Sequence, residues 1–331
     1  MLAGDMTGDL RICALRISFL SDEDESTTGS GQFLLESEGI DCDDYTIDPA
    51  PHDRSYFESQ LKAVDGYFNS VSYGKFGIDL DQSTVFPFGE NDSYALENSM
   101  NYYNPYDQSE IQEERIIILF ADAIYKAYEI DQIDFSTYDL VVVFHAGIGQ
   151  DFSLPFLDPT PEDIPSTYVD NKMVLEHLAS SSISVGNHDI SHGIILPETQ
   201  NHLLFDIAET MFLDAPEPCE YQYGLTGTFA LMIGFAVGLP PLWNIETGES
   251  GVGVFGLMDQ GSNNGRGIVP SPPTAWTRSF AGWEIPTNAG FGSAVNLPSR
   301  SENQLVKVLI NDNEYFLIEN RDNTIHDGIS L

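Results

Sequence analysis

The stretch that decides the fold is Gly227-Thr-Phe-Ala-Leu-Met-Ile-Gly-Phe-Ala-Val-Gly-Leu-Pro-Pro-Leu-Trp-Asn244, which carries no charged residue. A segment that is apolar on every side is typical of a buried core helix or of a membrane span. Its three glycines, the Pro240-Pro241 pair, the acidic flanks and the lack of a nearby Lys or Arg favour the first interpretation. The sequence therefore predicts a central helix that the rest of the chain covers.

Around this stretch the chain is strongly acidic. Its 331 residues include 52 Asp and Glu but only 13 Lys and Arg, which gives a formal net charge of −39. This balance disfavours nucleic acids and anionic membranes as partners, because both require clustered basic side chains. It suits high-salt or extracellular, calcium-rich surroundings, where counterions screen the repulsion. With 42% hydrophobic residues the chain is not a disordered one, and it is long enough for one large domain or two.

Two short motifs lie within and after the apolar stretch. Gly238-Leu239-Pro240 is near its end, and Phe255-Gly-Leu-Met258 comes a short distance later. In this order and spacing the chain resembles the immune inhibitor A-like metallopeptidases, peptidase family M-six, which carry a His-Glu-x-x-His-x-x-Gly helix, a Leu-Pro-Asp segment and a Met-turn. The resemblance implies a mixed α/β, metzincin-like domain with a mixed β-sheet, a central buried helix, a Met-turn at Met258 and C-terminal strands.

The residues that would carry the chemistry of that family are replaced. Leu231 and Phe235 stand at the positions of the two zinc-binding histidines, Met232 at that of the general base, and Pro241 at that of a third, acidic ligand. Catalytic zinc needs three ligands from His, Asp, Glu or Cys and an open position for water. Apolar side chains and a thioether do not supply such a set. The sequence therefore predicts no zinc, no catalytic residue and no hydrolysis of proteins.

Histidines elsewhere in the chain are candidates for replacement ligands. His145 follows an apolar strand and could be a ligand, although a hydrogen-bonded structural role is the simpler interpretation. His188-Asp189-Ile-Ser-His192 imitates the missing spacing, but glycines and serines around it indicate turn and strand. Residues i and i+4 of a strand lie roughly 13 Å apart, too far to share one zinc. An active peptidase with these three histidines as non-standard ligands remains the alternative hypothesis.

Acidic and sulfur-containing side chains leave further alternatives open. The acidic loop 21–31 could hold calcium or be a plain solvated loop, and Asp259 could coordinate a cation or cap a turn. Cys13 lies in an apolar run and is predicted to be a buried thiol. A disulfide between Cys42 and Cys219 could form, but the spacing does not specify it.

The resemblance implies that residues 1–9 lead into a metallopeptidase-like domain at 10–290, with a subdomain break near 238, and that 291–331 begin a C-terminal β region that is expected to be truncated. Periodicity divides the chain into elements. Helices are predicted at 55–71, 109–128, 171–178, 201–213 (with His202 exposed) and 273–283, and strands at 10–20, 76–80, 83–88, 139–144, 295–297, 304–310 and 314–319.

The leading functional hypothesis is a catalytically inactive homologue that serves as a binding or structural module of a larger secreted protein. No secretory signal begins the chain, so secretion is implied by the resemblance alone. A peptide or protein would occupy the former substrate cleft, whose surroundings are Gly238, Asn244, Met258 and Asp259. A purely structural extracellular domain is the other alternative.

Overall fold

A mixed β-sheet forms the centre of the computed structural model, which describes residues 6–21, 23–36, 42, 45–152, 158–205, 207, 211, 218–290, 292–299 and 305–322. The sheet order is β4-β2-β6-β10-β7, and β5 pairs with β2 beside β4. All strands run parallel except β7, which is antiparallel to β10 at the edge. The strands are β2 (Ile12–Ser18), β4 (Thr84–Phe86), β5 (Tyr94–Ala95), β6 (Leu140–Ile148), β7 (Thr167–Val169) and β10 (Gly193–Thr199). The mixed α/β class expected from the sequence is confirmed.

The three central strands β2, β6 and β10 are buried along their whole length. Burial on both faces explains their nearly continuous apolar sequence. Alternate side chains of β6 enter different cores: Val141 and Val143 enter one, and Val142 and Phe144 enter the other. The sheet therefore separates two apolar cores.

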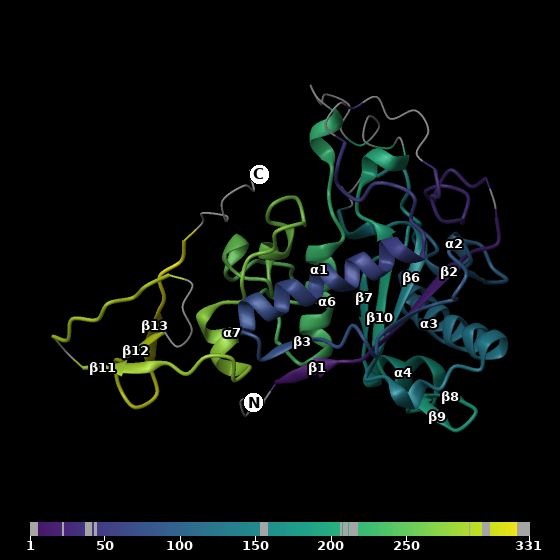
Figure 1. Ribbon diagram of the computed structural model, residues 1–331. Coiled ribbons are helices and arrows are strands. Elements are labelled where there is room, and N and C mark those ends of the chain that lie inside the picture. The colour runs from purple at the N-terminus through teal and green to yellow at the C-terminus, as the bar shows by residue number, and fades with distance from the viewer. Residues whose placement is uncertain are drawn as a thin grey trace.

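Helices cover both faces of the sheet, as Figure 1 shows. On one face lie α1 (Arg54–Ser72) and α6 (Thr226–Ala236), and on the other lie α3 (Ser109–Asp131) and α4 (Asn171–Leu178). The Asp53 side chain caps α1 by accepting a hydrogen bond from the Tyr56 N–H. Among the described residues, no helix is both long and apolar enough to cross a membrane.

Two glycines let α6 lie close to its neighbours. A Cβ on Gly227 would stand 1.9 Å from the Ser262 carbonyl oxygen, and one on Gly234 would stand 2.6 Å from the Met258 sulfur. Neither position has room for a side chain. The glycines that punctuate the apolar stretch therefore set the contact between α6 and the chain that follows it.

Smaller elements complete the main body. They are β1 (Gly8–Leu10) with β3 (Phe76–Ile78), the hairpin β8 (Ile183–Val185) with β9 (His188–Ile190), α2 (Met100–Tyr103), and 3-10 turns at Phe135–Thr137, Gln150–Phe152, His202–Phe205, Pro218–Tyr221, Gly253–Phe255 and Gln260–Asn263.

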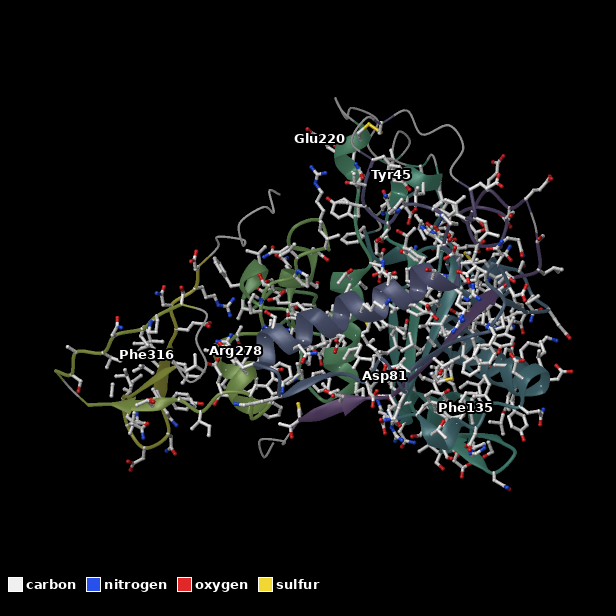
Figure 2. The ribbon with its side chains drawn as sticks, viewed as in Figure 1. Tyr45, Asp81, Phe135, Glu220, Arg278 and Phe316 are labelled. Atoms are coloured by element: carbon white, nitrogen blue, oxygen red, sulfur yellow. A yellow bond between two sulfur atoms is a disulfide. The ribbon has the colours of Figure 1, made fainter. Side chains whose placement is uncertain are left out.

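A second, three-stranded sheet stands apart from the main body at the C-terminal side (Figure 1). It consists of β11 (Thr287–Ala289), β12 (Val306–Leu309) and β13 (Tyr315–Ile318), and it follows the short helix α7 (Ala275–Phe280). Arg278 of α7 lies between this sheet, which carries Phe316, and the main body (Figure 2). Its guanidinium pairs with Glu284 and, at 2.7 Å, with Glu319, just after β13.

The structure corrects two predicted elements and one predicted exposure. Residues 295–297 form no strand: Val295 is exposed, and Pro298, which lacks an N–H, follows. β11 pairs with β12 instead, although its sequence Thr-Asn-Ala has little strand preference. The predicted helix 201–213 begins as a 3-10 turn, and its residues 206, 208–210, 212 and 213 lie outside the described part. His202 is only 3% exposed, because the turn directs it into the protein rather than toward solvent.

The structure shows the state of all three cysteines. Cys42 and Cys219 form a disulfide across 177 residues of sequence, and Figure 2 shows it beside Glu220. It ties the loop before α1 to the segment before α6. Cys13 is a buried free thiol on β2, as predicted, and burial raises its pKa.

Candidate functional site

The C-terminal half of α6 carries the positions that a zinc-binding helix would use. Met232 is 8% exposed and belongs to the core between α6 and the sheet, whereas Leu231 and Phe235 are half-buried against its margin. Of these three side chains, only Met232 is buried. Since Leu231 and Phe235 lie one turn apart, they form a single apolar surface at the end of the helix.

Phe235 lies between two other aromatic side chains. Its ring is 5.5 Å from that of Trp243, in an edge-on arrangement, and 6.4 Å from that of Tyr168, nearly parallel to it. These centroid distances are in the range of favourable aromatic contacts. The position that would hold an imidazole ligand thus belongs to an aromatic cluster, defined as Tyr168, Phe235 and Trp243.

The cluster adjoins the edge of the main sheet. Tyr168 belongs to β7, which pairs with β10 and ends the order of strands in the sheet as described. A strand in this position presents backbone N–H and C=O groups that a further extended chain can pair with. The aromatic cluster and a strand edge therefore lie side by side.

The segment after α6 is fixed to the helix. Gly238 is exposed and has φ +89°, which turns the chain, and the Leu239 N–H donates to the Gly234 carbonyl. Met258 is fully buried against Gly234, and its carbonyl accepts from the Leu242 N–H at 2.8 Å. Met258 therefore lies directly beneath the helix that carries Leu231 and Phe235.

Asp259 organises the loop that follows Asn244. One of its carboxylate oxygens accepts hydrogen bonds from the Ser250 hydroxyl and from three N–H groups, those of Gly251, Val252 and Gly253, all at 2.8–2.9 Å. Burial opposes ionisation, but these donors outweigh it and hold the pKa of Asp259 below its usual range. It also caps the turn Gln260–Asn263, so the capping interpretation is confirmed. Asn244 is exposed and caps a neighbouring turn through the Glu246 N–H.

The three histidines considered as replacement ligands lie elsewhere. His145 is inside β6 rather than at its end, and its ring is 6.0 Å from Phe19 in the core on the α3 side. Burial lowers its pKa to about 4, and its Nδ1 is 2.9 Å from the Ala146 carbonyl oxygen. His188 of β9 lies 3.5 Å from the exposed Asp134. His192 is half-buried just before β10, where burial lowers its pKa.

No metal cluster joins these groups in the described part of the chain: no three His, Cys, Asp or Glu side chains there are arranged to hold an ion. The acidic loop 21–31 is held by hydrogen bonds within itself and to other segments, such as the one from the Thr28 N–H to Asp163. Asp24 accepts from both the N–H and the hydroxyl of Ser26, which lowers its pKa. Pro241, at the position of the third ligand, is half-buried.

A buried polar network, which the sequence did not predict, connects β10 with β6 and with the chain before α1. Glu198 of β10 is fully buried, and its carboxylate accepts from His52 at 2.6 Å, from the Gly147 N–H at 2.6 Å and from the Leu34 N–H at 2.9 Å. Burial opposes protonation of His52, but the hydrogen bond and charge of Glu198 outweigh it, so the pKa of His52 is raised. The sequence does not predict this pair, because His52 and Glu198 lie 146 positions apart.

The same network reaches the start of α6. Asp48 accepts hydrogen bonds from the Leu225 N–H at 2.8 Å and from the Thr199 hydroxyl at 3.1 Å, and burial raises its pKa. A carboxylate at a helix N-terminus is favoured by the helix dipole. Since the network is sealed from solvent, it positions elements and does not meet a substrate.

Two cavities of about 360 Å³ each lie along α3, on the face of the sheet opposite α6. They share Asp122 and Tyr125. The Asp122 carboxylate accepts from the Tyr103 hydroxyl at 2.9 Å, and burial raises its pKa. No residue of α6 lines either cavity.

No protein-family model matches the chain, and no curated protein is significantly similar to it. The functional interpretation therefore rests on the sequence motifs and on the geometry described above.

Proposed function

We propose that this chain is a catalytically inactive relative of the immune inhibitor A-like metallopeptidases, which binds an extended peptide or protein segment and does not cleave it. The observation that carries the proposal is an apolar surface on α6 at the positions where the resemblance would place zinc ligands. Leu231 and Phe235 occupy the helix face, and Met258 lies beneath Gly234 as a Met-turn residue would. A secreted location is part of the same proposal, and the Cys42–Cys219 disulfide supports it.

The binding surface consists of the aromatic cluster and the edge of β7. An extended segment pairs its backbone with the strand edge, and its apolar side chains contact Phe235 and Trp243. Basic residues in that segment are favoured, because a chain of net charge −39 attracts cations at long range.

A fluorescence-polarisation titration tests this function. The probe is a labelled synthetic peptide of alternating valine and lysine, which is extended, apolar on one face and basic on the other. We expect saturable binding that Trp243→Ala weakens about tenfold, because truncation of a contacting aromatic anchor costs more than about 1 kcal/mol.

The matched control is Tyr125→Ala, which removes an exposed aromatic on the opposite face of the sheet. It should leave the affinity unchanged. Equal affinities for the parent and Trp243→Ala, or no saturable binding at all, would favour a purely structural module instead.

A further inference from the structure

One surface turn carries a modification motif that the binding function does not use. Asn91-Asp92-Ser93 has the form Asn-x-Ser with x other than proline, which is the acceptor pattern for N-linked glycans. The motif lies between β4 and β5. Asn91 and Asp92 are exposed and Ser93 is half-buried. Within the described part of the chain, the Asn91 side chain makes no hydrogen bond.

Hydrogen bonds from Arg16 and Arg54 hold the turn that carries Asn91. The buried Arg16 donates to the carbonyl oxygens of Pro87, Gly89 and Glu90 at 2.6–2.9 Å. The Arg54 N–H also donates to the Glu90 carbonyl at 2.9 Å. The residues just before Asn91 are therefore held against the protein, while Asn91 itself is exposed.

The disulfide supplies an independent indication of the compartment. Disulfides persist in oxidising, extracytoplasmic compartments, and N-glycosylation also takes place on chains that enter such compartments. Cys42 and Cys219 are joined in the fold, and the chain has a single free cysteine, which is buried. A chain that acquires this bond passes through surroundings where an acceptor asparagine can be modified.

We propose that Asn91 is the attachment site of an N-linked glycan. The donor is an oligosaccharide bound through its anomeric carbon to an isoprenoid phosphate. A bond forms between that carbon and Nδ2 of Asn91, while the bond from the carbon to the phosphate oxygen breaks. The phosphate leaves with the bonding electron pair, and Nδ2 loses one proton, so no oxidant or reductant is needed.

The fold also indicates when the transfer takes place. The Ser93 hydroxyl, which completes the acceptor motif, donates to the Ser18 hydroxyl of β2 at 2.8 Å. The next residue, Tyr94, begins β5 and pairs with Ile17 of β2. A transferase that reads the Ser93 hydroxyl must therefore act before β5 joins the sheet, and the glycan then remains outside on the closed turn.

Mass spectrometry of the whole chain, secreted from a host that has an oligosaccharyltransferase, tests the proposal. We expect one glycan, which peptide N-glycosidase removes while converting position 91 to aspartate. Asn91→Gln and Ser93→Ala should abolish the modification. Ser93→Thr keeps a hydroxyl in place and should retain it, which separates loss of the motif from a general effect of changing Ser93.

A positive control shows that the chain meets the transferase. Glu246→Thr gives the exposed Asn244 an Asn-x-Thr context in a second surface turn. Glycosylation at Asn244 of this variant, with Asn91 unmodified in the same molecules, would overturn the proposal. A parent protein that forms the disulfide and carries no glycan at Asn91 would overturn it as well.

Discussion

At the scale of single residues, the chemistry of α6 depends on the apolar side chains Leu231, Met232 and Phe235. Met232 contributes to a core, whereas Leu231 and Phe235 remain partly accessible. A half-buried apolar surface offers no lone pair to a metal and no carboxylate to a water molecule. It does offer contact area to another apolar group.

Phe235→His tests whether a single imidazole restores any zinc affinity. The substitution removes apolar and aromatic contacts with Tyr168 and Trp243, and we expect a loss of about 1–2 kcal/mol, less than for a fully buried ring. Added zinc should not change the unfolding temperature, because one imidazole alone does not supply the three protein ligands of a catalytic zinc site.

The matched control is Phe255→His, at a ring that is 69% exposed, which should be nearly neutral. A Phe235→His variant as stable as its parent would show that the aromatic cluster contributes nothing. Stabilisation by zinc would contradict the account of the ligand positions.

His52→Ala tests the buried network by its pH dependence. Removing His52 leaves Glu198 buried without its charged partner, which costs about 3–5 kcal/mol. The folded-state pKa of His52 is raised, so its protonation stabilises the fold fully below the unfolded value of about 6.5 and progressively less as the pH rises through the folded value.

The measurement is urea unfolding of the parent and of His52→Ala across this pH range, with His177→Ala at a solvent-accessible pair as control. The difference in unfolding free energy should be largest at low pH and should shrink as the pH rises. A difference that grows with pH would mean that His52 is neutral in the folded protein.

At the scale of elements, most of the fold is predictable from periodicity. The helices at α1, α3 and α4 and the buried strand β6 follow their apolar patterns closely. What the patterns miss depends on distant partners: β11 exists because β12 pairs with it, and 295–297 have no such partner. The His52–Glu198 contact and the disulfide likewise join residues that are 146 and 177 positions apart, which local sequence does not encode.

The candidate site is likewise only partly predictable from the sequence. The buried apolar helix α6 and the capping role of Asp259 follow from apolar composition and turn chemistry. The contribution of Tyr168 does not, because β7 reaches α6 only through the antiparallel pairing of β7 with β10.

Glu319→Gln tests how the C-terminal sheet is attached. Glu319 pairs with Arg278 at 2.7 Å and with Arg321 at 2.9 Å, and Arg278 is nearly buried. Without this carboxylate the sheet loses its ion pair with Arg278. We therefore expect faster amide hydrogen exchange in β12 and β13, and unchanged exchange in β6. Asp312→Asn, at an exposed position in the turn between β12 and β13, should have no such effect. Unchanged exchange in Glu319→Gln would mean that apolar contacts alone hold the sheet.

At the scale of the whole molecule, the surface charge opposes the compact state. The net charge of −39 implies repulsion between many exposed carboxylates, which salt screens with a Debye length of about 10 Å at 0.1 M. We expect the melting temperature to rise with sodium chloride. Calcium chloride at equal ionic strength distinguishes specific sites from screening, because a larger rise would reveal bound calcium. A melting temperature that does not change with either salt would show that repulsion between these charges does not destabilise the fold.

The central claim is that the chain keeps the frame of a metallopeptidase and lacks its chemistry. Incubation of the purified, zinc-supplemented protein with casein, with and without a zinc chelator, tests it most directly. Because Leu231, Met232 and Phe235 supply neither ligands nor a general base, the account predicts no cleavage in either condition. Casein cleavage that the chelator abolishes and added zinc restores would contradict it.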